Sequence, residues 1–291
     1  MFHVITRHFL TGDEVSRDEL GALLARAREL KAAPLSSSAL ERRAVALLFL
    51  RPSTRTRVSF ETGIAELGGH PMVLRGEDLQ LDRGESVGDT ARVLSRHVSA
   101  IGVRTGADEW VQALAAESTV PVVNMLTAGH HPCQALADLM TLQEAFGELD
   151  GLRLAYVGDG NNVARSLVRV GARAGVEVVT ASPRGYTLDE GTVLEDPAEA
   201  VAGAHAVYAD VWVSMGDEET AEARRAALAP YRLDAALLDR AAPGAVALHC
   251  LPAHPGQEIS AEILYGDRQR IWDQAENRRH VQKALLELLV R

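Results

Sequence analysis

The segment Ser53-Thr54-Arg55-Thr56 places three hydroxyls and a guanidinium at the point where a helix should begin. Apolar residues follow at helical spacing until Gly68-Gly69, which would end that helix. A helix N-terminus offers free backbone N–H donors and a partial positive charge, and arginine adds a planar fork that matches phosphate oxygens. The segment therefore predicts an anion site. These residues alone leave open a second interpretation, a helix N-cap beside solvated arginines.

A second polar segment, His131-Pro132-Cys133-Gln134, lies at a predicted strand-to-helix turn. Its imidazole and carboxamide can both donate hydrogen bonds to a carbonyl oxygen, as electrophilic stabilisation of acyl transfer requires. A helix-capping turn with a buried histidine is the alternative. Arg104 follows another apolar run, and taken alone it favours a surface salt bridge.

A third group, Asp210 with Ser214, could bind an ammonium ion through a carboxylate for charge and a hydroxyl for orientation. The side chains of the neighbouring Trp212 and Met215 are interpreted as packing residues. The backbone of Met215 could still contact a ligand. Cys250 follows an apolar run and by default is an inert core thiol.

The sequence disfavours two other chemistries, dinucleotide binding and zinc binding. Gly158-Asp159-Gly160 follows a predicted strand, but Val163 stands where a dinucleotide fingerprint has its third glycine, and no acid ends the run 176–180. The pairs His131/Cys133 and His249/Cys250 could hold zinc, but their spacing fits no common zinc pattern.

These polar groups follow short apolar runs that alternate with helical patterns. The runs cover residues 44–50, 98–103, 120–125, 152–157, 176–180, 204–209 and 246–249. Strands that alternate with helices predict an α/β fold of two doubly wound parallel-sheet domains. Ligands of such sheets bind beyond the carboxyl ends of the strands. We therefore expect an active site in the cleft between the two domains.

Other patterns in the sequence predict helices and the boundary between the two domains. Ser16 and Glu19 form a predicted capping box, and apolar residues at helical spacing predict a helix over 17–32. A helical pattern over 134–147 precedes a turn and a fresh strand, so the domain boundary is predicted beside it, with domains 1–134 and 135–274. The last pattern predicts a terminal helix, within 275–291, that packs back on the first domain.

Composition excludes several classes of protein. The formal net charge of -10 over 291 residues argues against a general nucleic-acid or anionic-membrane surface. The sequence shows no signal-peptide pattern and no apolar run long enough to span a membrane. Two cysteines are too few for a disulfide framework. We expect a reduced, cytoplasmic protein.

Taken together, four segments resemble the aspartate/ornithine carbamoyltransferase family, over about residues 51 to 278. FLRPSTRTRVSFE and HPCQALADL look like the family's carbamoyl phosphate motifs. DVWVSMG and HCLPA look like the segments with which the ornithine branch holds its amino acid. The loop LQLDRGES has Arg83 before Gly84-Glu85, where the aspartate branch has a lysine. The segment His254-Pro255-Gly256, which follows HCLPA, matches none of the family's motifs.

The resemblance implies a role for each matching residue. Carbamoyl phosphate would be bound by Ser53, Thr54, Arg55, Thr56, Gln80, Arg104, His131, Gln134 and Arg278. Ornithine would be bound by Asn162, Asp210, Ser214, Met215, Cys250 and Leu251. Gln80 would reach the phosphate site of a neighbouring subunit. The catalytic groups would be Arg55, Arg104, His131 and Cys250.

The implied reaction transfers the carbamoyl group of carbamoyl phosphate to the side-chain amine of L-ornithine, which gives L-citrulline and phosphate in arginine metabolism. The first domain would bind carbamoyl phosphate and the second ornithine. The resemblance implies no metal or organic cofactor, and it implies a homotrimer, or a multiple of trimers, with shared active sites. The biosynthetic or catabolic direction stays open. The rivals are a non-catalytic binding protein of the same fold and a nicotinamide oxidoreductase.

Overall fold

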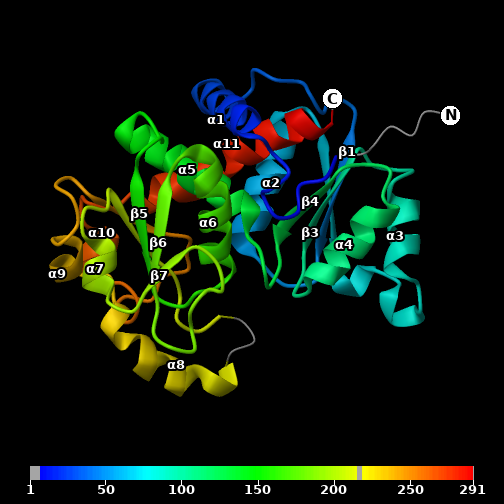
Figure 1. Ribbon diagram of the computed structural model, residues 1–291. Coiled ribbons are helices and arrows are strands. Elements are labelled where there is room, and N and C mark those ends of the chain that lie inside the picture. The colour runs from blue at the N-terminus through cyan, green and yellow to red at the C-terminus, as the bar shows by residue number, and fades with distance from the viewer. Residues whose placement is uncertain (1–6, 215–217, 291) are drawn as a thin grey trace. The chain divides into compact units, whose positions relative to one another are not determined.

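The computed structural model describes residues 7–214 and 218–290, which fold into two compact units. The first unit comprises residues 1–136 and 277–291, and the second comprises 137–276. Each unit is built on a single sheet in which every strand pair is parallel (Figure 1). The predicted fold class, two parallel α/β sheets, is confirmed.

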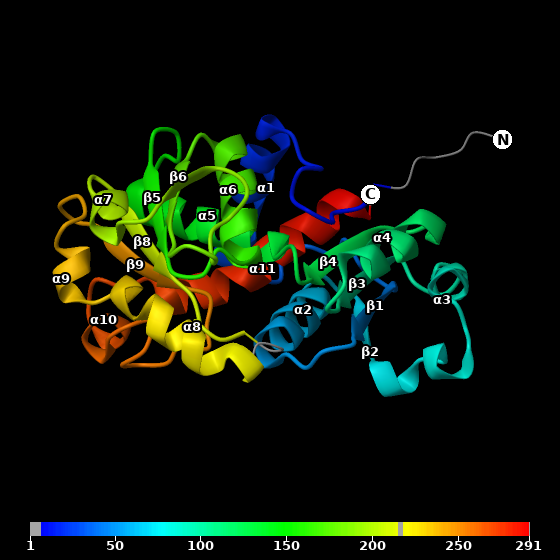
Figure 2. The ribbon, with the colours of Figure 1, turned by 60° about the horizontal axis from the view of Figure 1, so that its bottom comes forward.

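The sheet of the first unit has the strand order β2-β1-β3-β4. Its strands are β1 (Ala44–Phe49), β2 (His70–Arg75), β3 (Ala100–Arg104) and β4 (Val122–Leu126). Its helices are α1 (Arg17–Ala32), α2 (Thr54–Glu66), α3 (Val87–Leu94) and α4 (Asp108–Glu117), with 3-10 turns at Gly76–Asp78 and Leu81–Arg83. Helices α3 and α4 lie together on one face of this sheet (Figures 1 and 2). There Ala91 and Leu114 pack against Leu48 and Ile101.

The sheet of the second unit has the order β7-β6-β5-β8-β9. Its strands are β5 (Arg153–Val157), β6 (Glu177–Ala181), β7 (Thr192–Leu194), β8 (Ala206–Ala209) and β9 (Val246–His249). Its helices are α6 (Asn162–Ala174), α7 (Pro197–Val201), α8 (Ala221–Leu228), α9 (Ala235–Leu238) and α10 (Ala261–Tyr265), with 3-10 turns at Glu218–Thr220 and Ala229–Tyr231. Residues of α7, α9 and α10 pack on one face of the sheet through Val201, Leu238 and Ile263.

Two helices run across the division between the units. Helix α5 (Pro132–Phe146) begins in the first unit and ends in the second, whereas α11 (Ile271–Leu289) begins in the second and ends in the first. Both therefore carry residues of each unit.

Local signals in the sequence placed most of these elements. The predicted helix over 17–32 is confirmed, and so is its capping box: Ser16 Oγ accepts from Glu19 N at 3.2 Å while Glu19 Oε2 accepts from Ser16 N at 2.9 Å. Strands β2 and β7 were not predicted. Strand β2 is a half-exposed edge strand that contains a proline, and β7 has only three residues, so neither forms a continuous apolar run.

Helices α2 and α11 are joined by a buried lysine. Lys283 has no exposed side-chain surface, and its Nζ donates to Glu66 Oε2 at 2.7 Å and to the Pro34 carbonyl at 2.6 Å. Arg279 lies 3.2 Å from the other oxygen of Glu66. A Cβ added at Gly63 of α2 would lie 3.1 Å from Lys283 Cγ, so the small residue permits this close approach. The ion pair fixes α11 against the helix that begins at Thr54.

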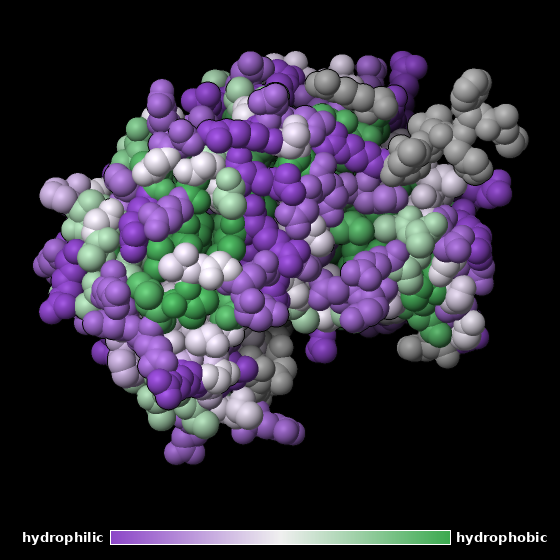
Figure 3. Space-filling model, in the orientation of Figure 1, coloured by the Kyte–Doolittle hydropathy of each residue, from purple (hydrophilic) through white to green (hydrophobic). Residues whose placement is uncertain are grey.

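Hydrophilic side chains cover much of the face in Figure 3, with hydrophobic residues gathered in smaller areas between them. The exposed large hydrophobic residues in the described part of the chain are Leu35, Val58, Met72, Val93, Tyr265 and Trp272. Within 7–214 and 218–290, no helix has both the length and the apolar character needed to cross a membrane.

Candidate functional site

The polar segment after β1 forms a helix N-terminus. Helix α2 begins at Thr54, and Ser53 is its N-cap, with Oγ accepting from Thr56 N at 3.3 Å. No acidic residue stands in the first turn. The N–H groups of this turn and the macrodipole of a 13-residue helix together favour an anion at this end. The predicted anion site and the predicted N-cap are thus compatible, because the same residues form both.

Arginines from two other elements meet at Thr56, whose side chain is buried. Arg104, the last residue of β3, donates from Nη1 to Thr56 Oγ1 at 3.4 Å, and Arg278 of α11 donates from Nη2 to the same oxygen at 2.7 Å. Both arginines are less than 10 % exposed, at 7 % and 3 %. The interpretation of Arg104 as a surface salt bridge is therefore wrong. Two guanidinium groups brought together at the N-terminus of α2 favour a bound anion.

Arg55 adds a third guanidinium to this group. It is half-buried in the first turn of α2, and its Nε is a buried atom without a hydrogen-bond partner among the described residues. Buried polar atoms normally have partners, so a donor left over at a helix N-terminus is itself a sign of a ligand.

His131 lies among the three arginines and carries no charge at neutral pH. Burial lowers the pKa of its imidazole well below the usual value of 6.5, and the positive charges of Arg278, Arg104 and Arg55 lower it further. The neutral ring is therefore favoured here, and a neutral imidazole still has one N–H to donate. Gln134, in the first turn of α5, is buried as well.

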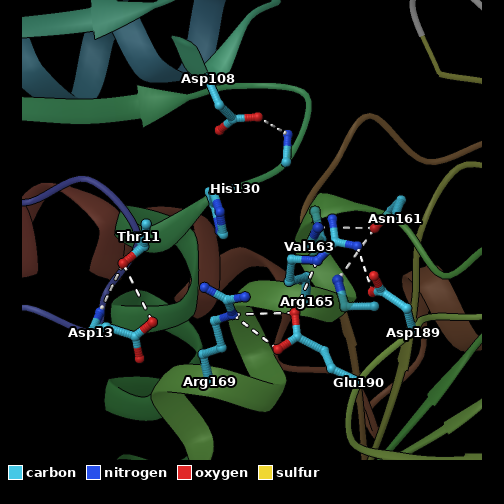
Figure 4. A network of polar contacts seen from close by, with 12 residues as sticks. Thr11, Asp13, Asp108, His130, Asn161, Val163, Arg165, Arg169, Asp189 and Glu190 are labelled. Carbon is cyan, nitrogen blue, oxygen red and sulfur yellow. Dashed lines mark hydrogen bonds and ion pairs between the residues drawn. The ribbon is translucent and has the colours of Figure 1, made fainter. Parts of the chain in front are cut away.

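The loop before His131 is held by a carboxylate at the start of α4. Asp108 accepts a hydrogen bond from Thr127 Oγ1. It accepts a second one, at 2.8 Å, from Gly129 N, which is the dashed line at Asp108 in Figure 4. A Cβ at position 129 would lie 2.5 Å from Asp108 Oδ2, so a larger residue there would displace this carboxylate. The loop therefore enters α5 in one defined conformation, which sets where His131 stands.

Gln80 is exposed on the segment between β2 and α3, where its carbonyl accepts from Arg83 N and Glu85 N at 3.0 and 3.2 Å. Its exposed position contrasts with the buried positions of Thr56, Arg104 and His131.

A second polar group lies at the strand ends of the second unit, around Asp210. This residue follows β8 and is 5 % exposed. Asn161 donates from Nδ2 to Asp210 Oδ2 at 2.7 Å, and Cys250 donates from Sγ to Asp210 Oδ1 at 2.9 Å. Both of these donors are neutral, so they orient the carboxylate without cancelling its charge. A buried carboxylate of this kind favours a bound cation such as an ammonium group.

Asn161 also connects this carboxylate to α6. Its Oδ1 caps the helix by accepting from Val163 N at 2.9 Å (Figure 4) and from Ala164 N at 3.2 Å. Tyr156 OH also donates to it, at 3.2 Å. Burial raises the pKa of Tyr156 well above its usual value, and the negative charge of Asp210 raises it further, so the phenol stays a neutral donor.

The remaining predicted residues of the second unit occupy the same strand ends. Asn162 is the first residue of α6, Ser214 is half-buried after β8, and Leu251 follows Cys250 with a left-handed backbone, φ 60°. Met215 lies outside the described residues. Trp212 is buried, as predicted for a packing residue.

Three potential metal ligands cluster here: Asp210, His249 and Cys250 offer ligand atoms within 4.8 Å of one another. However, His249 Nδ1 accepts from Leu251 N at 2.8 Å, and His249 Nε2 lies 3.3 Å from Glu258 Oε1. An ion bound to this imidazole would have to displace one of those partners.

Sequence reasoning missed two contributors to this half of the site, Tyr156 and Glu258. The asparagines after β5 suit a polar substrate by residue type, but the bond from Asn161 to Asp210 was not predicted. Tyr156 is hidden within an apolar run. Glu258 gives no local signal, since it reaches His249 only through the turn between them.

Comparison with known proteins agrees with this geometry. Residues 7–144 match the family model "Aspartate/ornithine carbamoyltransferase, carbamoyl-P binding domain", and residues 150–289 match "Aspartate/ornithine carbamoyltransferase, Asp/Orn binding domain". The ornithine carbamoyltransferase of Acidothermus cellulolyticus is 51% identical over 305 residues, which cover 98% of this chain and 96% of that protein. That of Bacillus subtilis is 47% identical over 300 residues, covering 98% and 94%.

Solved structures give the same result. The crystal structure of ornithine carbamoyltransferase from Thermus thermophilus superposes with a TM-score of 0.92 at 41% identity and covers 99% of this chain and 100% of that one. The enzyme from Pyrococcus furiosus gives 0.92 at 43% identity, covering 98% and 97%. The chain belongs to the aspartate/ornithine carbamoyltransferase family.

Proposed function

We propose that this protein transfers the carbamoyl group of carbamoyl phosphate to the side-chain amine of L-ornithine, giving L-citrulline and phosphate. The observation that carries the proposal is the pairing of two opposite environments in one chain. One unit holds three arginines around a helix N-terminus and a neutral histidine, and the other holds a buried carboxylate with neutral donors. The first suits a phosphate dianion, and the second suits a substrate amine.

In the first unit, the N–H groups and hydroxyls at the start of α2 bind the phosphate, and Arg55, Arg104 and Arg278 neutralise it. Neutral His131 donates a hydrogen bond to the carbamoyl oxygen, and Gln134 contacts the carbamoyl group. These donors stand where negative charge grows as the carbonyl is attacked, so they stabilise the transition state more than the substrate. The phosphate-binding set is Ser53, Thr54, Arg55, Thr56, Gln80, Arg104, His131, Gln134 and Arg278.

In the second unit, Asp210 and Cys250 bind and orient the side-chain amine. The ornithine-binding set is Asn162, Asp210, Ser214, Met215, Cys250 and Leu251. Asp210 and Cys250 orient the amine in its uncharged form, because only the neutral amine has a lone pair with which its nitrogen can attack.

The chemistry then needs no further group. The neutral amine nitrogen forms a bond to the carbamoyl carbon, the bond from that carbon to the phosphate oxygen breaks, and the departing phosphate takes one proton from the attacking nitrogen. Holding both substrates in reacting geometry contributes up to ~7–11 kcal/mol to catalysis.

We also propose the domain assignment and the assembly. Residues 1–134 with 275–291 bind carbamoyl phosphate, residues 135–274 bind ornithine, and the chain works as a homotrimer or a multiple of trimers with Gln80 in a neighbour's site. A cytoplasmic location is supported by two free thiols, Cys133 and Cys250. A role in arginine biosynthesis is supported by the structural likeness to an anabolic ornithine carbamoyltransferase of Campylobacter jejuni, at a TM-score of 0.91.

The test assays product formation from carbamoyl phosphate with ornithine, aspartate, putrescine and acetylornithine in parallel. We expect turnover with ornithine and a drop in kcat of at least about a hundredfold in Arg55→Ala, because a donor to the developing charge is lost. Arg57→Ala is the matched control, since Arg57 lies in the same helix turn but is 43% exposed and paired with Glu61 at 2.8 Å. It should stay within about twofold of wild type. Turnover with another amine but not ornithine, or an Arg55→Ala variant as active as Arg57→Ala, would refute the proposal.

A further inference from the structure

Glu258 is a buried carboxylate that the reaction described above does not use. It is 1 % exposed, and it lies between β9 and α10 in the second unit. Its Oε1 accepts from His254 N and lies 3.3 Å from His249 Nε2, whereas Oε2 is buried without a hydrogen-bond partner among the described residues. A buried carboxylate is costly unless it is paired and hydrogen-bonded, so the contacts of Glu258 indicate a specific role.

The contacts of His249 determine which of its nitrogens carries the proton. Leu251 N donates to His249 Nδ1 at 2.8 Å, so Nδ1 must be the acceptor. The ring proton is then on Nε2 and points to Glu258. A carboxylate can only accept, and it therefore enforces this tautomer. An amide could instead present a donor to Nε2 and favour the tautomer that loses the Leu251 contact.

The Leu251 contact in turn supports an unfavourable backbone. Leu251 has φ 60°, a left-handed conformation that residues other than glycine rarely adopt. Cys250 stands between His249 and Leu251, and its Sγ donates to Asp210 at 2.9 Å. If the hydrogen bond to Nδ1 were lost, Leu251 would relax and turn the adjoining peptide, and the thiol would move away from Asp210.

The geometry points to Glu258 as a positioning residue for the amine site: through His249 it holds the Cys250–Leu251 backbone so that the thiol orients Asp210. The same carboxylate also holds the turn over residues 254–257. It accepts from His254 N, and the carbonyl of His254 accepts from Gln257 N at 2.9 Å. The unfamiliar His254-Pro255-Gly256 segment is thus the turn that brings Glu258 back to His249. This inference rests on the proposed function, since the amine that Asp210 binds is taken to be that of ornithine.

The first test compares Glu258→Ala and Glu258→Gln in steady-state assays. We expect the alanine variant to raise KM for ornithine about tenfold, with KM for carbamoyl phosphate unchanged, as for loss of one hydrogen bond to a charged group. The glutamine variant should fall between alanine and wild type, because its amide oxygen can still accept both hydrogen bonds. Glu262→Gln, an exposed carboxylate on α10, is the matched control. A purely structural role would lower the amount of active enzyme without this selective change in KM.

The second test measures the rate at which the Cys250 thiol reacts with a disulfide reagent. Cys133 is buried and its pKa is raised to about 12 by burial, so a disulfide reagent such as dithionitrobenzoate reports on Cys250, which Cys250→Ser should confirm. Glu258→Ala should change the labelling rate severalfold, and Glu262→Gln should not. Unchanged labelling together with a KM for ornithine within about twofold of wild type would overturn the inference.

Substitutions of His249 test the same positioning role if Glu258→Ala does not fold. An asparagine places an oxygen near the position of Nδ1, whereas a glutamine places its amide near Nε2. We expect His249→Asn to keep the Leu251 contact and a lower KM for ornithine than His249→Gln, and the reverse order would contradict the mechanism. Absence of citrulline formation by the wild-type protein would refute the proposed function instead, so the two failures are distinguishable.

Discussion

At the scale of single residues, the neutral His131 among three arginines is the most informative observation. Its neutrality results from burial and from cationic neighbours, and neither depends on the residues adjacent to it in sequence. The segment His131–Gln134 could be recognised from its residue types, but its charge state could not. The partners of Asn161 and Glu258, which are Asp210 and His249, could not be predicted from the sequence either. Sequence reasoning identified the groups with obvious chemistry and missed the groups that hold them.

The lowered pKa of His131 predicts a pH dependence of stability. Below pH 6.5 the unfolded chain takes up a proton on this ring while the folded protein does not, so stability must fall as the pH falls below that value. Between pH 7.5 and 5.5 we expect wild type to lose about 1.4 kcal/mol more than His131→Asn in the free energy of denaturant unfolding. His97→Asn, at an exposed position, controls for the loss of an imidazole in general. Equal pH dependence of wild type and His131→Asn would contradict a buried neutral ring.

At the scale of elements, the pairing of α2 with α11 brings the phosphate-binding groups together. Helix α2 presents Ser53 to Thr56 at its N-terminus, and α11 presents Arg278 to Thr56. The sequence predicted both helices from apolar spacing and a strand-to-helix turn. It could not predict their pairing, because that depends on Lys283 and Glu66, which are 217 residues apart.

The buried ion pair predicts a large effect of removing one partner. Lys283→Met leaves Glu66 in a largely buried position with Arg279 as its remaining partner, and it should lower stability by about 3–5 kcal/mol. Arg57→Met is the control, since Arg57 forms an ion pair with Glu61 on the same helix, α2, and these side chains are 43% and 34% exposed. Its loss should cost at most about 1 kcal/mol. Denaturant unfolding monitored by circular dichroism measures both, and similar values for the two variants would show that the buried pair does not fix α11.

At the scale of the whole molecule, the two sheets carry their polar groups at the carboxyl ends of their strands, as the alternation of apolar runs predicted. The parallel direction of the strands followed from that alternation. The edge strands β2 and β7 did not, because edge strands need no continuous apolar run. Assembly is not encoded in such local patterns, and the proposed trimer rests on family resemblance and the exposed Gln80 segment.

The proposed sharing of sites predicts complementation between two defective variants. If Gln80 acts in a neighbour's site, Arg55→Ala and Gln80→Ala chains are each impaired, but hybrids contain some sites with both native residues. Random mixing should restore about a quarter of the sites. Mixing Arg55→Ala with Arg278→Ala is the control, because both residues belong to the same unit of one chain and no hybrid site contains both. Activity in co-expressed hybrids is the measurement, and equal recovery in the two mixtures would refute the sharing.

The burial of Lys283 has a practical consequence for handling this protein. Among 30 basic residues the chain has only two side-chain amines, and one of them is shut away from solvent between α2 and α11. An amine-directed dye or resin can therefore reach only Lys31 among the lysine side chains of the folded protein. Conjugation would attach a reporter at the last turn of α1, and the arginine-rich surface would stay chemically unmodified.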